Sequence, residues 1–204
     1  MRRPPTCHEP CRADRSGAGP HGKPRCWWAL STPEYVSYHD SEWGRQLHGE
    51  AKLFERLTLE AFQSGLSWLT ILRKRENFRR AFDAFDIDRV AGYGGPEIER
   101  LLGDAGIIRN RRKIEATITN ARAARDLHAN GETLDDVIWS FAPDQGSRPA
   151  PKTGADLAAT TAESTAMAKE LKRRGFVFVG PTTAYATMQA AGLVNDHLAG
   201  CAFR

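Results

Sequence analysis

The sequence contains no apolar run long enough to cross a bilayer, and no apolar segment follows the two arginines near its start. We therefore expect neither a membrane span nor a secretory signal, and we expect a cytoplasmic protein. Cysteine is scarce, with 4 among 204 residues. Because cytoplasmic thiols stay reduced, we interpret these cysteines as metal ligands or buried thiols rather than as a disulfide framework.

Strand-like sequence is also nearly absent. Only FVFVG, residues 176–180, has the pattern of a strand, and one strand of that length cannot build a sheet. There is no internal repeat. Helical periodicity and helix caps, such as Thr32 before Pro33, predict an all-α fold instead. Helices are expected within residues 31–44, 50–65, 66–82, 86–94, 96–106, 107–131, 133–142, 163–175 and 181–192, and a loop over 142–162.

Large apolar side chains are almost missing from residues 1–24, which carry five prolines and three glycines. This composition predicts a disordered tail, which includes Cys7 and Cys11, followed by one compact helical domain over residues 25–204. The apolar fraction of 41% and the charged fraction of 26% are ordinary for a globular protein. The net charge of +4 permits a nucleic-acid partner without requiring one.

Histidine and cysteine occur near both ends of the predicted domain. His197 and Cys201 are four residues apart, so on a helical turn they would face the same way. With Cys26 and His39 they would make a Cys2His2 set that closes a tetrahedron around zinc and leaves no open position. Such a site is structural. The alternatives are that Cys26 and His39 are ordinary buried residues, or that a Cys-His pair in the tail supplies the missing ligands.

One acidic residue interrupts the apolar stripe of the helix expected at 50–65. Glu60 lies three residues after Leu57 and seven after Leu53, on the face that should point to the core. A buried carboxylate is costly unless something pairs with it. It could cap a helix boundary beside an ordinary aromatic core, or it could lie in an aromatic pocket suited to a flat cationic ligand such as an alkylated purine. The aromatic residues in question are Trp27, Trp28, Tyr35, Tyr38, Trp43 and Trp68.

The segment LLGDAGIIRNRRKI combines glycines with basic residues. A hairpin from Gly103 to Gly106 would stop one helix just before the next begins. A helix N-terminus backed by basic side chains is a reasonable grip for a DNA phosphate, although a glycine cap followed by a solvated basic face has the same pattern. The basic residues concerned are Arg109, Arg111, Arg112 and Lys113.

These segments together resemble a known family. RCWW, YVSYHDSEWG, LFERLTLEAFQSGLSWLTILRKRENFRRAF, DAGIIRNRRKI, VIWSF and KRRGFVFVGPTTAYATMQAAGLVNDHLAGC are similar to bacterial DNA-3-methyladenine glycosylase I, of the helix-hairpin-helix glycosylase superfamily. The resemblance covers nearly all of residues 25–201. It implies a helix-hairpin-helix element and one structural zinc per chain, clipping the two ends of the domain together. The implied zinc ligands are Cys26, His39, His197 and Cys201.

The resemblance also implies a reaction and a partner. The partner is double-stranded DNA with alkylated bases, and the reaction is base excision, in which the flipped 3-methyladenine is released as the free base. Glu60 is the implied catalytic residue. Gly65 and Leu66 are candidates for wedging into the gap that the flipped base leaves. Residues implied to bind the base are Tyr35, Tyr38, Trp43, Glu60 and Trp68.

The sequence departs from the family at Trp27, where glycine is usual, and in AFQSGLSW, which replaces QQAGLSW. No lysine is placed as a Schiff-base nucleophile, so we expect a monofunctional glycosylase without strand cleavage. We also expect a monomer. The alternative is a non-enzymatic, zinc-stabilised helical DNA-binding module. A hydrolase with catalytic zinc would need an open coordination position, which four protein ligands deny.

Overall fold

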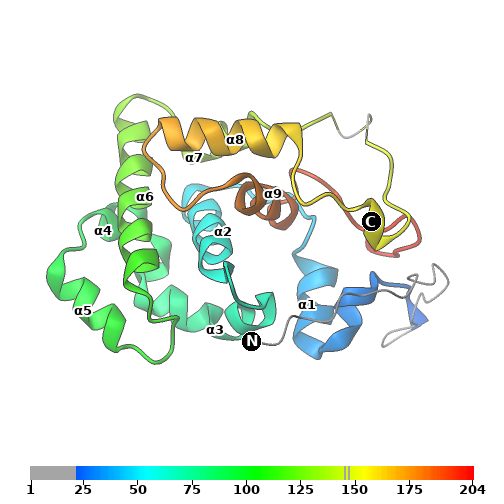
Figure 1. Cartoon of the computed structure of the whole chain (residues 1–204), viewed down its shortest axis with the longest axis horizontal. Helices are drawn as coiled ribbons and strands as arrows, with labels where there is room; N and C mark the ends of the chain where they lie inside the picture. The colour runs from blue at the N-terminus through cyan, green and yellow to red at the C-terminus, as the bar shows by residue number, and fades with distance from the viewer. Residues whose placement is uncertain (1–21, 145, 147) are drawn as a thin grey trace.

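The computed structural model describes residues 22–144, 146 and 148–204, and every regular element in these ranges is helical. No strand forms in this part of the chain, which confirms the predicted all-α, single-domain fold (Figure 1). The predicted tail lies outside the described residues as far as position 21. The α-helices are α1 (Pro33–Ser41), α2 (Glu50–Gln63), α3 (Trp68–Ala81), α4 (Ile87–Ala91), α5 (Gly95–Gly103), α6 (Arg111–Ala129), α7 (Leu134–Trp139), α8 (Ala162–Arg173) and α9 (Pro181–Ala190). The 3-10 turns are η2 (Trp27–Ser31), η3 (Asp83–Phe85) and η5 (Gly154–Asp156).

Two local predictions were wrong. The helix expected from residue 107 begins at Arg111, because the Asn110 side chain accepts from the amide of Lys113 and caps the helix there. FVFVG is not a strand, since Phe178 has a left-handed φ of 59°. The preceding Val177 pairs its amide and carbonyl with the side chain of Asn120 on α6. A side-chain amide thus takes the hydrogen bonds that a strand partner would have supplied.

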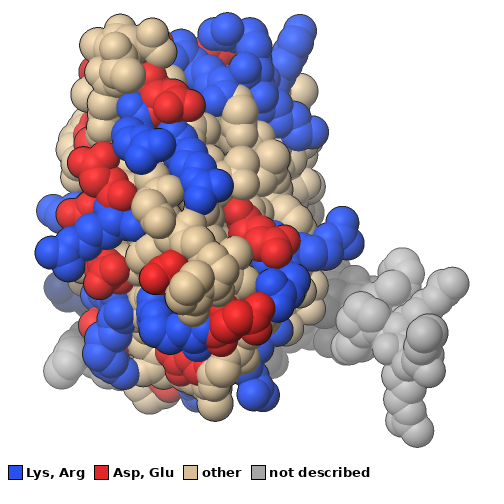
Figure 2. Space-filling view, turned by 90° about the vertical axis from the view of Figure 1, so that its left-hand side faces the viewer, with Lys and Arg blue, Asp and Glu red and all other residues tan. Residues whose placement is uncertain are grey.

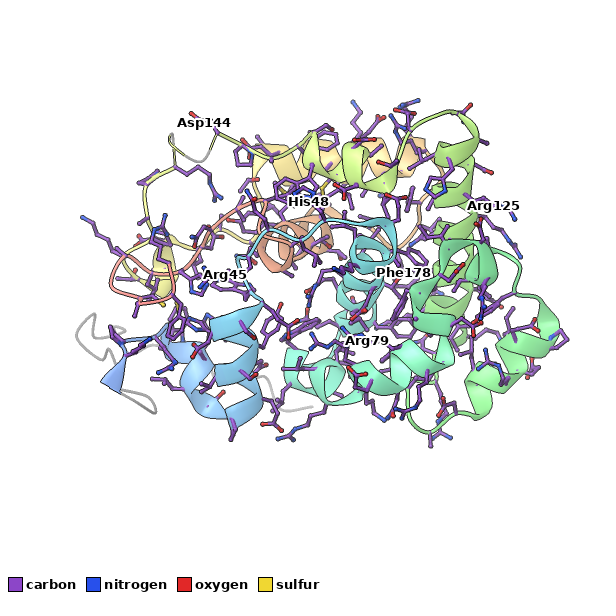
Figure 3. All side chains as sticks on the ribbon, turned by 180° about the vertical axis from the view of Figure 1, so that it is seen from behind. Arg45, His48, Arg79, Arg125, Asp144 and Phe178 are labelled. Carbon is purple, nitrogen blue, oxygen red and sulfur yellow. The ribbon has the colours of Figure 1, made fainter. Side chains whose placement is uncertain are left out.

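Helix α2 is the centre of the fold, packed against α3, α6, α7 and α9 (Figure 1). All ten residues from 53 to 62 are buried. Three of them are charged, and two of those have ion-pair partners. Glu55 pairs with Arg79 of α3, labelled in Figure 3, at 2.8 Å, and Arg56 reaches Glu42 at 3.2 Å. The third is Glu60, whose surroundings are described below.

The first and last described segments meet at one side of the molecule, opposite α5 (Figure 1). The amide of Ala202 donates to the carbonyl of Pro24 at 2.9 Å, and that of Ala199 to Pro151 at 2.8 Å. The closure brings residues far apart in the sequence into one cluster. None of the described helices is both long and apolar enough to span a membrane.

Candidate functional site

The side chains of Cys26, His39, His197 and Cys201 converge where the two ends of the domain meet, and we call this cluster the clasp. One ligand atom from each lies within 4.8 Å of all the others, and all four residues are buried. Cys201 Sγ lies 3.5 Å from both His39 Nε2 and His197 Nδ1, and Cys26 Sγ lies 3.8 Å from His197 Nδ1. Tetrahedral coordination with zinc–ligand lengths separates ligand atoms by about 3.3–3.8 Å. The clasp therefore could hold a metal ion that joins the two ends.

The atoms of the clasp that face away from its centre are also fixed. His39 Nδ1 lies 2.8 Å from Asp40, which Arg25 holds in turn at 2.7 Å. His197 Nε2 lies 3.0 Å from the carbonyl of Trp43. These contacts leave His39 Nε2 and His197 Nδ1 directed at the centre, as the outer partners of metal-binding histidines do.

The sulfur atoms of the clasp have donors suited to thiolates. The amide of Leu198 donates to Cys26 Sγ, and that of Phe203 donates to Cys201 Sγ, both at 3.4 Å. Burial raises the pKa of the Cys26 thiol to about 12 and lowers the pKa of His197 to about 4. A neutral imidazole is the form that binds a metal. A cation that prefers nitrogen and sulfur ligands, as zinc does, would displace the thiol protons and bind the cysteines as thiolates.

Close packing around the clasp explains one glycine. Gly44 has a left-handed φ of 72°, and a Cβ there would lie 3.0 Å from the ring of His197. A larger residue would therefore strain the backbone and push the imidazole from its position.

The second candidate site is a cavity of about 620 Å³ beside the clasp, which we call the pocket. It contains all five residues expected to bind a base, so the structure brings together what the sequence separates by more than thirty positions. The residues lining it are Trp27, Trp28, Ser31, Tyr35, Tyr38, Trp43, Glu60, Gln63, Trp68, Leu157, Ala186 and Gln189. Sequence reasoning missed the contributions of α9 and of the 142–162 loop, because no periodic or compositional signal marks them.

Glu60 differs from the other buried charges of α2. In the described part of the chain its carboxylate has no hydrogen-bond or ion-pair partner, although it is only 6% exposed. Burial raises its pKa to about 7, against an opposing influence from Arg56 one turn earlier. A carboxylate that costs this much to bury, on the wall of a cavity, is available to a ligand with donors or positive charge.

Aromatic rings line the same pocket as this carboxylate and meet one another at several angles. Trp28 meets Trp43 edge-on at 5.0 Å between centroids, and Tyr38 lies tilted against Trp68 at 5.4 Å. The indole Nε1 of Trp68 is buried and has no hydrogen-bond partner among the described residues. The pocket thus combines ring faces, an acceptor with charge and a spare donor, which together suit a planar nitrogen base.

The turn between α2 and α3 presents Leu66 to solvent. Gly65 has a left-handed φ of 82°, and Leu66 is 41% exposed, which is unusual for leucine. Lys113 supports this turn from α6, because its ammonium donates to the carbonyls of Phe62 at 2.8 Å and Ser64 at 2.6 Å. Lys113 is buried, so it differs from the exposed arginines of the same segment.

The 104–110 connection between α5 and α6 is docked on α3. Lys74 donates to the carbonyls of Ala105 and Gly106, and Asn77 also donates to Gly106. The Gly106 amide is itself bonded to Asp104 at 2.7 Å, whereas no atom approaches the place of a Cβ on Gly103. Close packing therefore requires a glycine at position 106 but not at 103, and the Gly106 amide is already bonded within the turn, so side chains are what this segment offers to a partner.

Three basic side chains of this segment are exposed, namely those of Arg109, Arg111 and Arg112. Arg111 is paired with Glu99 at 2.6 Å. On the face that carries α4, α5 and α6, basic and acidic side chains are intermingled (Figure 2). The electrostatic attraction from this face therefore depends on individual arginines rather than on a uniform basic surface.

The turn between α8 and α9 is a feature that sequence reasoning missed. Val177 and Phe178, the latter labelled in Figure 3, are each 39% exposed. Asn120, which holds Val177, lies seven residues after Lys113, which holds the Leu66 turn. Residues seven apart share one face of a helix, so α6 positions both exposed apolar turns from the same side.

Comparison with known proteins gives a consistent result. A family model described as methyladenine glycosylase matches residues 28–204. DNA-3-methyladenine glycosylase 1 of Escherichia coli is 49% identical over 177 residues, covering 87% of this chain and 95% of that protein. A crystal structure of 3-methyladenine DNA glycosylase I superposes with a TM-score of 0.82 at 47% identity, covering 87% and 98% of the two chains. A structure of 3-methyladenine DNA glycosylase I from Staphylococcus aureus, described as the structural basis of 3-methyladenine recognition, superposes with a TM-score of 0.79 at 34% identity. The match covers 87% of this chain and 95% of that one.

Proposed function

The chain belongs to the methyladenine glycosylase family, and we propose that it excises 3-methyladenine from alkylated DNA by hydrolysing the N-glycosidic bond. The observation that carries this proposal is the Glu60 carboxylate, which is buried under aromatic rings without a partner in the described part of the chain. A purely structural glutamate would be paired, as Glu55 of the same helix is. A non-enzymatic DNA-binding module has no use for this arrangement.

The chemistry follows from the lesion's own charge. Alkylation at N3 of a nucleoside leaves a fixed positive charge on the base, which weakens its stacking and makes it a good leaving group. The Glu60 carboxylate would accept hydrogen bonds from the flipped base and complement its charge, while Tyr38 and Trp68 stack on the ring. The protein then has little acid–base work to do, and water attacks the sugar as the base departs. Tyr35 and Trp43 would complete the wall.

We propose that the clasp holds one zinc ion, with Cys26, His39, His197 and Cys201 as its ligands. The donor set, the spacing of its atoms and the fixed outer contacts of both imidazoles support this identity. Zinc in such a site cross-links the chain ends and leaves no position for substrate. Every step of the reaction is assigned to the pocket.

For the DNA surface, we propose that Leu66 enters the space left by the flipped base, on a turn that Gly65 allows and Lys113 supports. Arg109, Arg111 and Arg112 would contact phosphates, after a hairpin that runs from Gly103, where α5 ends, through the tightly packed Gly106. The exposed turn at Val177 and Phe178 lies against the same helix. Those two turns would face the duplex together.

The reaction should leave the DNA strand intact. Strand cleavage by a lyase needs an amine that can attack the sugar, and no lysine lines the described pocket. The buried ammonium of Lys113 is already bonded to two carbonyls. We therefore propose a monofunctional glycosylase.

Incubation of the full-length protein with methylated duplex DNA tests the proposed function. Chromatography of the released bases should show free 3-methyladenine, and the strands should remain uncut until alkali is added. A protein that binds this DNA but releases no base would instead be the non-enzymatic zinc-stabilised module.

A further inference from the structure

Trp27 is the most exposed large apolar side chain of the described residues, at 46%. It follows Cys26 directly, so the clasp fixes its backbone. It lines the pocket together with Trp28 and Tyr35. A tryptophan held at this position while half of it faces solvent needs an explanation, because burying a ring of that size would be strongly favourable.

The far edge of the Trp27 indole rests against a distant segment of the chain. A Cβ built on Gly154 would lie 2.5 Å from Trp27 Cη2, so only a glycine admits the ring there. Three residues further on, Leu157 also lines the pocket. The ring therefore reaches from η2 to η5, and it forms part of the rim of the pocket.

Trp27 is not simply one more core aromatic. Trp28, its neighbour, packs edge-on against both Tyr35 and Trp43, at 5.7 Å and 5.0 Å between centroids. In the described chain no aromatic ring packs against the indole of Trp27. Because Trp27 is also 46% exposed and lines the cavity, part of its ring is available to a planar molecule in the pocket.

We propose that Trp27 is a base-contacting residue of the pocket rim, which packs on the flipped alkylated purine and retains the free base after excision. The inference rests on the proposed function, and it adds to the pocket an aromatic contact beside Gly154 of η5. Because the ring is seated on Gly154, it is held in place before the base arrives, and little conformational entropy is lost on binding. Trp27 thereby sets how tightly the product is held.

The test is a calorimetric titration of free 3-methyladenine into the wild type, Trp27→Ala and Trp27→Phe. We expect Trp27→Ala to weaken binding about five- to tenfold, the usual scale for losing one base–aromatic contact, and Trp27→Phe to recover most of it. Metal content and thermal stability, measured on the same samples, report any damage to the neighbouring clasp. A structural role would lower stability while leaving the affinity of the folded protein unchanged, and that result would overturn the proposal.

Gly154→Ala reaches the same ring from η5 and leaves the sequence around Cys26 unchanged. The new methyl group should displace the indole and weaken 3-methyladenine binding in the same direction, with metal content intact. Wild-type affinity in Gly154→Ala together with Trp27→Ala would contradict the role of Trp27. A wild type that releases 3-methyladenine from DNA while both variants bind the free base normally refutes this inference alone. A wild type that releases none refutes the proposed function as well.

Discussion

The clasp and the pocket share the stretch of chain from Cys26 to Trp43, yet the polar groups of the clasp have partners and the carboxylate of the pocket has none in the described chain. Tyr38 lines the pocket and His39, the next residue, lies in the clasp. In the clasp, the outer ring nitrogen of each histidine has an acceptor and each sulfur has an amide donor. In the pocket, Glu60 has neither a hydrogen bond nor an ion pair from the described chain.

The difference separates stability from function. Groups whose partners are supplied by the protein and its bound metal hold the fold together and have nothing left to offer a substrate. A buried carboxylate without a partner costs stability, and a fold retains such a group where a ligand repays the cost. The clasp should therefore control folding, and the pocket should control recognition.

The largest expected effect comes from breaking the clasp. Cys201→Ala or His197→Ala should lower stability by about 3–5 kcal/mol, because a cross-link that closes a very long loop is lost. Thermal unfolding and metal analysis check this, and excision by the surviving folded fraction should change little. His48→Ala is the matched control, since His48 is an exposed histidine paired with Asp135 away from the clasp. Wild-type protein that is stable and contains no metal would show that the clasp does not hold the fold through a metal ion.

The next effect concerns the ionisation of Glu60. With its pKa at about 7, the carboxylate is largely protonated at pH 6 and largely ionised at pH 8. Excision, measured as kcat/KM on DNA with 3-methyladenine, should therefore rise roughly tenfold between these values, since kcat/KM reports the free enzyme. In Glu60→Gln the activity should be low, and kcat/KM should no longer rise between pH 6 and pH 8. An unchanged rise in the variant would show that another group titrates in this range.

Ionisation of Glu60, which should raise activity, should lower the stability of the fold. The pKa of Glu60 is raised from 4.5 in the unfolded chain, so between about pH 4.5 and pH 7 the folded state binds more protons. Stability then falls as pH rises through this window. Glu60→Gln should abolish that slope and gain on the order of 1–3 kcal/mol at pH 8, with no gain at pH 4. Urea unfolding at the two pH values measures it.

A smaller effect should follow from Lys113→Met, which keeps the length of the side chain but removes both hydrogen bonds to the Leu66 turn. We expect about 1–3 kcal/mol of lost stability and slower excision from duplex DNA. Affinity for free 3-methyladenine should be retained, because Lys113 does not line the pocket. Equal losses with duplex and with free base would place the effect in the pocket instead of the turn.

The smallest effect is expected at the exposed arginines. Arg112→Ala should weaken binding to lesion and undamaged DNA alike and reduce the salt slope by about 1, as expected for one lost phosphate contact. Arg111→Ala is the matched comparison and should do less, because Arg111 is paired with Glu99. Fluorescence anisotropy across a salt series measures both. If the salt dependence of DNA affinity stays at the wild-type value in both variants, this hairpin does not contact DNA.

Much of this arrangement could be predicted from the sequence because its signals are local. Thr32 and Pro33 marked the start of α1, and the structure places the Thr32 cap on the amide of Tyr35. Glu60 interrupts an apolar stripe, which left a helix cap and a pocket carboxylate as alternatives, and in the structure it lines a cavity. Cysteine and histidine are rare enough that four of them near the domain ends indicated a joint site.

What could not be predicted depends on contacts between distant segments. Gln189 and Leu157 line the pocket, but nothing in their local sequence distinguishes them from other surface or core residues. Lys113 follows two exposed arginines, and only tertiary packing directs its side chain to Ser64. FVFVG has strand propensity, which the side chain of Asn120 overrides.

We propose that Glu60 recognises the base while the clasp holds the fold. Calorimetric titration of free 3-methyladenine into wild type and Glu60→Gln at equal metal content tests it most directly. Charge-assisted hydrogen bonds contribute about 1.5–3 kcal/mol, so Glu60→Gln should bind roughly ten- to a hundredfold more weakly, with affinity for undamaged DNA unchanged. Equal affinities of the two proteins for 3-methyladenine would show that Glu60 is a structural residue and that the base binds elsewhere.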